Sequence, residues 1–331
     1  MKRNLIIGFL FSSLLVYVAL KGTSISEVQA GLKQADYSYL VPICLLSIFG
    51  MYLRSYRWGI IIHPLEKIHQ RVLFPITVVG LMAVVLLPMR AGEIVRPYLV
   101  SRRSEIHLSS ALGTVAVERV FDGLTLMLFL MLITFFTELP GWAYQAGLSL
   151  LFFFLLVLLL LVLLVFRREF SSKWIGFMLK RVPDRIASPV MRMLNSFIDG
   201  LKVLPDTRRV TFVGFLSILV WLNMGFCIYL LFHSFHLGLP LVAAYVVLVL
   251  TALGLLVPTA PGFLGNFHLF CVIGLALFGI PKTEALSFAI LLHLVQIGCV
   301  GIIGLAFIPL IRISLSEFIF TKKQIPQVQP S

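Results

Sequence analysis

Residues 87–96 read LPMRAGEIVR and interrupt an apolar segment with a proline, a glycine and three charges. Three more charged residues, Glu118, Arg119 and Asp122, follow inside the next apolar segment. An ionised side chain near the centre of a bilayer costs roughly 2.5–3.5 kcal/mol even on lenient insertion scales. We therefore expect these six groups to face one another, a polar cavity or a charged ligand, and this stretch is the predicted functional site.

The composition of the chain is that of a membrane protein. Of its 331 residues, 60% are hydrophobic and 12% are charged, whereas a soluble domain carries about 25% charged residues. Apolar runs long enough to cross a bilayer recur from end to end, without the alternation typical of barrel strands. We predict an all-α polytopic membrane protein that forms a single integral membrane domain, residues 1–331.

Apolar segments and basic segments alternate along the chain. The apolar ones fall near residues 4–20, 37–62, 73–89, 109–137, 148–166, 210–232, 241–257, 266–280 and 284–311. Lys and Arg gather in 54–71, 90–107 and 167–209, but 138–147 and 233–240 contain none. The positive-inside rule places the basic segments and both termini in the cytoplasm, so the expected location is the cytoplasmic (inner) membrane. The net charge of +13 is then explained by topology and anionic lipid headgroups, and no nucleic-acid partner is expected.

The N-terminal apolar run has the outline of a signal peptide, because Met1, Lys2 and Arg3 precede it. The tripeptide at 28–30 that resembles a cleavage site lies about ten residues beyond the run, which is long for a signal peptide. We predict an uncleaved first membrane helix.

One topology satisfies the charge distribution. Segment 73–89 enters the membrane from the cytoplasm and returns as a re-entrant hairpin that turns near Pro88. Segments 241–257 and 266–280 form a second such hairpin from the outside. About six full spans remain, and the two hairpins face each other as an inverted repeat, with residues 1–137 as the first repeat and 138–331 as the second.

The linker 167–209 contains ten Lys or Arg and four acids. Within it, residues 188–204 predict an amphipathic helix that Ser188 caps, that has Pro189 at its first position and that Pro205 ends. Such a helix lies on the membrane surface. Two interpretations stay open: it anchors the topology, or it guides anionic lipid to a cavity.

Residues Arg90, Glu93 and Arg96 are spaced so that they project from similar sides of a helix. Pro88 breaks the preceding helix, and Gly92 permits an unusual backbone angle or a close approach. Two arginines beside one carboxylate leave a surplus of positive charge, which suits a phosphate. The alternative is a structural ion pair at the cytoplasmic interface.

Glu118 and Asp122 share one face of a helix, and Arg119 lies three residues before Asp122. Two carboxylates in a medium of low dielectric need cations or a shared proton. Proton-coupled transport and a static network that locks the helix to the first hairpin are equal alternatives here.

The second segment ends in Arg54, Arg57 and Trp58. Arg54 and Trp58 are interpreted as interface anchors, whereas Arg57 could reach the first hairpin and is included in the predicted site.

In the second half, the predicted helix break contains Pro258, Pro261, Gly262 and Gly265. Polar side chains at membrane depth are supplied by Asn266, His268, His293 and Gln296. The two histidines lack an accompanying carboxylate or thiolate, so we predict a hydrogen-bonded polar lining and no metal site.

Together these residues resemble the transmembrane region of lysylphosphatidylglycerol synthases and its stand-alone relatives, the flippase-like family. The resemblance covers roughly residues 4–312. The shared pattern is Arg54-Ser-Tyr-Arg57-Trp58, Leu87-Pro88-x-Arg90-x-Gly92-Glu93-x-x-Arg96, Glu118-Arg119-x-x-Asp122 and Pro261-Gly262-x-x-Gly265. Two positions depart from it, since many relatives have a glycine where Phe263 stands and a glutamate where His268 stands.

The resemblance implies a translocase that moves an anionic phospholipid or a polyprenyl-phosphate-linked lipid between leaflets. We expect Arg90, Arg96 and Arg119 to hold the phosphate, and Glu93, Glu118 and Asp122 to neutralise and orient these arginines. About 19 residues follow Arg312, so we expect no aminoacyl-transferase domain and no lipid lysinylation.

Two rival functions stay open. The first is a membrane-embedded transferase or hydrolase that acts on a lipid carrier, and the second is a non-catalytic membrane partner of a biosynthetic enzyme. Transport is favoured over catalysis, and no cofactor is expected. The oligomeric state is open, a homo-oligomer included.

Overall fold

The computed structural model describes residues 15, 17–18, 20–87, 92–179, 182–256 and 261–311. Every regular element within these ranges is helical, which confirms the prediction of an all-helical protein. The elements are α2 (Ile25–Gln34), η1 (Tyr37–Tyr39), α3 (Leu40–Ile62), α4 (Gln70–Leu86), α5 (Gly92–Ser101), α6 (Leu108–Ile133), α7 (Gly141–Phe166), α8 (Arg168–Leu179), α9 (Asp184–Gly200), α10 (Thr207–Ser234), α11 (Leu241–Gly254), η3 (Pro261–Phe263), α12 (Asn266–Ala276) and α13 (Lys282–Ile311). Pro88, Arg90, Pro258 and most of the segment 4–20 lie outside the described residues.

The helices that can cross a membrane are the long apolar ones. Four stretches are long and apolar enough: Tyr37–Ile62, Gly141–Phe166, Thr207–Ser234 and Lys282–Ile311. Helix α6 has 26 residues, about 39 Å of helix, but it carries the charged residues of the predicted site. The chain is therefore a multi-pass helical membrane protein, and the number of six spans stays a prediction.

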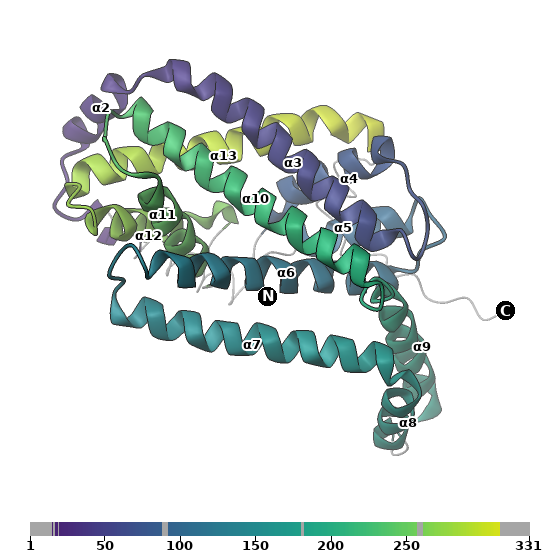
Figure 1. The fold of residues 1–331 in the computed structure, drawn as a ribbon. Helices are drawn as coiled ribbons and strands as arrows, with labels where there is room; N and C mark the ends of the chain where they lie inside the picture. The colour runs from purple at the N-terminus through teal and green to yellow at the C-terminus, as the bar shows by residue number, and fades with distance from the viewer. Residues whose placement is uncertain are drawn as a thin grey trace.

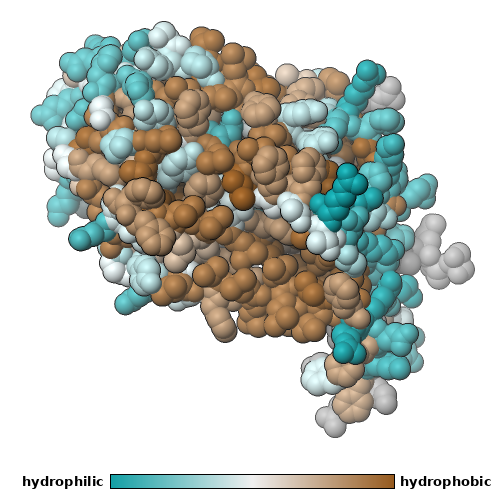
Figure 2. Space-filling view, in the orientation of Figure 1, coloured by the Kyte–Doolittle hydropathy of each residue, from teal (hydrophilic) through white to brown (hydrophobic). Residues whose placement is uncertain are grey.

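The basic segments meet at one end of the helical bundle, which we name the basic end. There the side chains of His63 and Arg209 are 3.0 Å apart, and the carboxylate of Glu66 accepts a hydrogen bond from the main chain of Glu105. Figure 1 shows the long helices running between this end and the opposite one. In Figure 2 an apolar band covers their middle, and hydrophilic side chains cover both ends, as a membrane protein requires.

Helices α3 and α10 form an antiparallel pair in the centre of the fold. Ser234 at the end of α10 donates to the carbonyl of Asp36, which directly precedes η1 and α3. In the middle, the Asn223 side chain donates to the carbonyl of Leu46, and Gly50 leaves the room that this amide occupies. The inward faces of α3 and α10 therefore pack against each other, although the two helices are about 170 residues apart in sequence.

Two pairs of shorter helices fold back on themselves as hairpins. In the first, α4 and α5 pack together. In the second, α11 and α12 are joined by a hydrogen bond of 3.0 Å from the Asn266 amide to the carbonyl of Gly254. Segment η3, between α11 and α12, contacts α4, so the two hairpins meet. Their re-entrant placement in a membrane and the inverted repeat stay predictions.

At Gly92 the two helices of the first hairpin, α4 and α5, approach each other closely. A Cβ atom at this residue would lie 2.1 Å from the main chain of Ala83 and Val84 on α4. We expect Gly92→Ala to destabilise the fold by about 1–3 kcal/mol or more, because a backbone contact cannot move aside as a side chain can. Thermal unfolding in lipid nanodiscs measures this. The control is Gly298→Ala on α13, where an added Cβ meets nothing within 4 Å; equal unfolding temperatures for both variants would contradict the prediction.

The structure corrects the predicted linker helix. The linker holds two helices, α8 and α9. Helix α9 starts at Asp184, and the carbonyl of Pro183 accepts hydrogen bonds from Ile186 and Ala187, so Ser188 is not the cap and Pro189 lies inside the helix. The helix ends at Gly200, which lies against the carbonyl of Ser110 on α6. Packing against α6, rather than Pro205, sets its end.

Candidate functional site

Glu118 lies at the centre of the charged groups and is completely buried on α6. Its two carboxylate oxygens accept hydrogen bonds from three arginines. Arg57 of α3 donates at 2.9 Å, Arg96 of α5 donates twice, at 2.7 and 3.2 Å, and Arg119 of α6 donates at 3.1 Å. One carboxylate thus joins three helices. Hydrogen bonds between ionised partners are about twice as strong as neutral ones.

Asp122, one helical turn further along α6, connects two of these arginines to the second half of the chain. It pairs with Arg57 at 2.6 Å and with Arg119 at 3.1 Å. The indole of Trp221 on α10 lies 3.4 Å from its carboxylate, and Arg57 donates to the hydroxyl of Ser217 on α10 at 2.7 Å. We name Arg57, Arg96, Glu118, Arg119 and Asp122 the arginine–carboxylate network.

Trp58 packs against this network inside the protein, so its interpretation as an interface anchor was wrong. The side chain is fully buried, and its indole N–H donates to the hydroxyl of Thr114 at 3.0 Å. The guanidinium of Arg96 lies 4.4 Å from the centre of the indole ring, a cation–π contact. Gly80 of α4 leaves room for Arg96, since a Cβ there would lie 2.8 Å from that side chain.

Arg54, also interpreted as an anchor, lies one turn before Arg57 and contacts α10. Its guanidinium is 3.0 Å from the sulfur of Met224, and a thioether is a weak acceptor. Arg54 is near enough to Asp122 and Glu118 to interact with their charges, as Glu93 is to Arg119.

The network carries more positive than negative charge. Three arginines face two carboxylates, and the nearby Arg54 and Glu93 add one charge of each sign, so a surplus of one positive charge remains. Burial is uneven: the side chains of Arg57 and Arg96 are 0% and 8% exposed, but that of Arg119 is 38% exposed. Arg119 lies about 17 Å along α6 from its start. The accessible part of the surplus charge therefore lies at mid-helix.

Of the polar residues predicted in the second half, His268 and His293 lie together and apart from the network, whereas Asn266 donates to the carbonyl of Gly254. The rings of His268 and His293 are 4.8 Å apart, and His293 stacks on Phe267 at 4.6 Å. The ring of His293 also lies within reach of the main chain of Gly262. Gln296, one turn further along α13, is half-buried. Within the described ranges no three His, Cys, Asp or Glu side chains gather as a metal site would require.

Positive backbone angles mark the helix break before α12. Gly262 and Gly265 have φ of 75° and 89°, and Phe263 between them has φ of 55°. Glycine adopts such angles without steric cost, whereas a side chain is strained there. Phe263 stands where many relatives are expected to have a glycine, so this chain accepts strain at the turn that contacts α4.

Sequence reasoning missed three polar contacts of the network: Ser217, Trp221 and Thr114. Ser217 and Trp221 are spaced by one helical turn on α10, so they share a face. That spacing is the signal that could have found them. Nothing local, however, indicates that this face turns toward α6.

Comparison with known proteins identifies relatives along nearly the whole chain. The model of the family described as lysylphosphatidylglycerol synthase TM region matches residues 5–304. Two UPF0104 membrane proteins of Methanothermobacter thermautotrophicus are similar. One is 22% identical over 89% of this chain and 92% of its own length, and the other is 24% identical over 90% and 91%. A UPF0104 membrane protein of Methanocaldococcus jannaschii is 24% identical over 88% of this chain and 89% of its own.

Proposed function

This chain belongs to the lysylphosphatidylglycerol synthase TM region family, and from that premise we propose that it moves a lipid with an anionic headgroup between the two leaflets of a membrane. The observation that carries the proposal is the surplus positive charge of the arginine–carboxylate network, accessible at Arg119. A guanidinium with free donors at membrane depth attracts a phosphate, because both groups have lost most of their water.

In this proposal the arginines of the network have different roles. Arg57 is fully buried and bridges Glu118, Asp122 and Ser217, so it holds the carboxylates in place. Arg119 makes the first contact with the phosphate. Arg96, bidentate on Glu118 and stacked on Trp58, stands next to it. We propose that Arg96, together with Arg90, contributes to the phosphate site, with Glu93 orienting Arg119.

The contacts favour transport over catalysis. A lipid transferase or hydrolase would need Glu118 or Asp122 as a general base, which must accept a proton from the substrate or water. Glu118 already accepts hydrogen bonds from three guanidinium groups, and Asp122 from Arg57. Carboxylates held in this way are poor proton acceptors. Such a network of fixed charges suits the binding and release of a lipid headgroup better than it suits proton transfer.

In this proposal the basic end faces the cytoplasm, because Lys and Arg gather there and are absent from 138–147 and 233–240. The protein then lies in the cytoplasmic membrane with both termini inside. The headgroup passes the network between the basic end and the opposite one, and its acyl chains stay in the surrounding lipid.

The test is leaflet exchange in reconstituted vesicles. Purified protein is inserted into vesicles that contain fluorescent phosphatidylglycerol or fluorescent phosphatidylcholine, and a membrane-impermeant reductant reports the fraction of label in the outer leaflet. We expect the protein to accelerate exchange of the anionic lipid, relative to protein-free vesicles, at least tenfold more than exchange of the zwitterionic lipid. Equal rates for both would contradict the proposed site. A lipid product that forms in detergent, where no leaflets exist, would support the transferase or hydrolase instead.

A further inference from the structure

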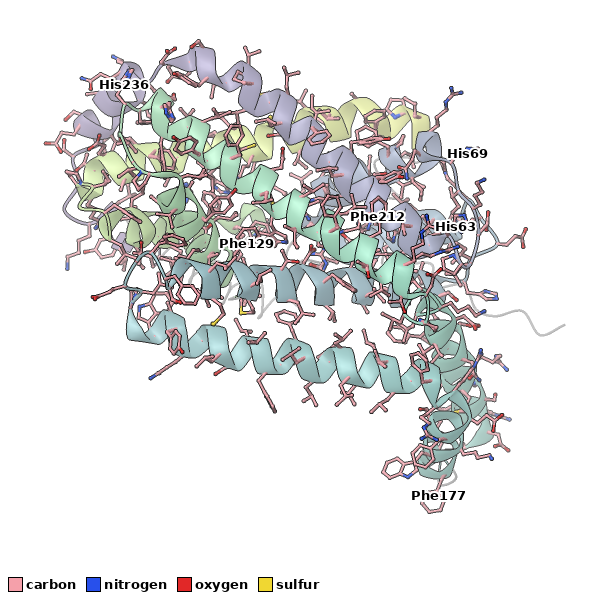
Figure 3. All side chains as sticks on the ribbon, in the orientation of Figure 1. His63, His69, Phe129, Phe177, Phe212 and His236 are labelled. Atoms are coloured by element: carbon pink, nitrogen blue, oxygen red, sulfur yellow. The ribbon has the colours of Figure 1, made fainter. Side chains whose placement is uncertain are left out.

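Helices α8 and α9 form an arm that projects from the basic end, past the end of α7 (Figure 1). Among the residues that the structure describes, the contacts of the arm with α6 lie near the end of α9. Ile198 is buried, Leu201 is buried in a cluster with Val117 and Val120 of α6, and Gly200 lies against the carbonyl of Ser110. The other end extends away from the bundle, and Phe177 lies at its tip (Figure 3). The packing against α6 sets the direction in which the arm leaves the bundle.

Each helix of the arm exposes an apolar stripe. On α8 the stripe is Phe170, Trp174 and Phe177, and on α9 it is Ile186, Val190 and Met193. Both triplets have the spacing i, i+4, i+7, which places their side chains on one helical face. The six side chains are between 39% and 68% exposed. Apolar patches of this kind mark a surface that contacts a partner or a membrane.

The patch continues a surface that already faces lipid. Only 6% of the apolar stretch of α7 is fully buried inside the molecule, and Phe152, Leu155, Leu159 and Leu163 are among its exposed side chains, which acyl chains would cover in a membrane. Phe166, the last residue of α7, is exposed and lies four residues before Phe170. The lipid that covers α7 thus borders directly on the stripe of α8. The arm turns away from the direction of α7 at this point (Figure 1), as a pair of helices on a membrane surface would if α7 spans the membrane.

Exposed cations flank the stripes. Lys173, Arg185 and Arg192 are exposed, whereas Asp199 is paired with both Arg168 and Lys202. Ten basic residues against four acidic ones leave the linker strongly positive. Trp and Phe beside Lys and Arg are the composition of helices that lie in the headgroup region. Each Lys or Arg near an anionic membrane surface strengthens the attraction of a basic segment to that surface by roughly fivefold.

We propose that the arm lies in the headgroup region of the leaflet at the basic end, with its apolar stripes inserted among the acyl chains, and that its cations gather anionic phospholipid there. This inference goes beyond the transport function and is independent of it, since it concerns the surface of the membrane and not the arginine–carboxylate network.

Depth measurements at single positions test the insertion. Spin labels are placed at Phe177→Cys and Val190→Cys, with Ser188→Cys as the matched control, because Ser188 lies on the polar side of α9 one half-turn from Val190. The labelled parent protein corrects for the four natural cysteines. In nanodiscs of phosphatidylglycerol and phosphatidylcholine, we expect positions 177 and 190 to be more accessible to oxygen than to a water-soluble nickel chelate, and position 188 the reverse.

Two results would overturn the insertion. If positions 177 and 190 are as accessible to the nickel chelate as position 188, the stripes face water. If both are protected from oxygen and from the chelate, the stripes pack against protein, and a second copy of the chain or another partner covers them.

Lipid selectivity tests the cations. A fluorophore at Phe177→Cys is quenched by headgroup-labelled phosphatidylglycerol or phosphatidylcholine in separate nanodiscs. We expect at least fivefold enrichment of the anionic lipid for the otherwise unchanged chain, and nearly equal quenching by both lipids when Lys173→Gln, Arg185→Gln and Arg192→Gln are combined. Lys33→Gln, at the opposite end of the bundle, is the control and should keep the enrichment. Unchanged enrichment in the triple variant would refute the role of the cations, whatever the rate of lipid exchange.

Discussion

Glu118→Gln is expected to cause the largest loss of stability among single substitutions in the arginine–carboxylate network. The carboxylate is the shared partner of Arg57, Arg96 and Arg119, which come from three helices. A neutral amide leaves three guanidinium groups with Asp122 as the remaining carboxylate, and the surplus of one positive charge becomes two. Breaking a buried ion pair by removing one partner costs about 3–5 kcal/mol.

Thermal unfolding of the purified protein in lipid nanodiscs measures this loss. Glu138→Gln serves as the control, because Glu138 is exposed in the connection between α6 and α7. The unfolding temperature of Glu118→Gln should fall by many degrees, and that of the control should stay within about one degree of the parent. A Glu118→Gln protein as stable as the control would show that the three arginines do not depend on this carboxylate.

Arg119→Gln is expected to cause the largest loss of transport while it leaves the fold intact. Arg57 and Arg96 continue to hold both carboxylates when Arg119 is removed, and Arg119 is the least buried member of the network. Its loss removes the accessible positive charge. A hydrogen bond to a charged group contributes about 1.5–3 kcal/mol, so exchange of phosphatidylglycerol should slow roughly 10- to 100-fold.

Two further variants make this result specific. Arg119→Lys keeps the charge but loses the planar fork, and it should retain an intermediate rate. Arg102→Gln removes an exposed arginine at the basic end and should leave the rate unchanged. Exchange by Arg119→Gln at the rate of the parent, with a normal unfolding temperature, would exclude Arg119 from the site.

The membrane helices could be read from the sequence because their signal is local. The segments 37–62 and 210–232 are continuous apolar runs, and they became η1 with α3 and α10 with boundaries that differ by at most three residues. The end of α9 could not be predicted from the sequence. The helix ends at Gly200, where it meets α6, and this contact joins segments that are far apart in sequence. Short-range rules, such as the preference for proline at the start of a helix, therefore gave the wrong boundaries for this helix.

The sequence predicted which residues form the candidate site, but it did not predict which of them contact one another. The cost of charge in a membrane is enough to indicate that Arg96, Glu118, Arg119 and Asp122 face one another. That Arg57 reaches α6 and α10 depends on how α3 and α10 pair, and this pairing brings residues 57 and 217 together. Trp58 was misread for the same reason: its composition fits an interface belt, but its neighbours are Arg96 and Thr114.

The most direct test of the central claim is whether one anionic lipid binds at Arg119. Native mass spectrometry of the protein, released from detergent after equilibration with equal amounts of phosphatidylglycerol and phosphatidylcholine, counts the retained lipids. We predict that the parent and Arg102→Gln retain one phosphatidylglycerol in preference to phosphatidylcholine, and that Arg119→Gln loses this preference. Retention of phosphatidylglycerol by Arg119→Gln at the level of the parent would contradict the claim.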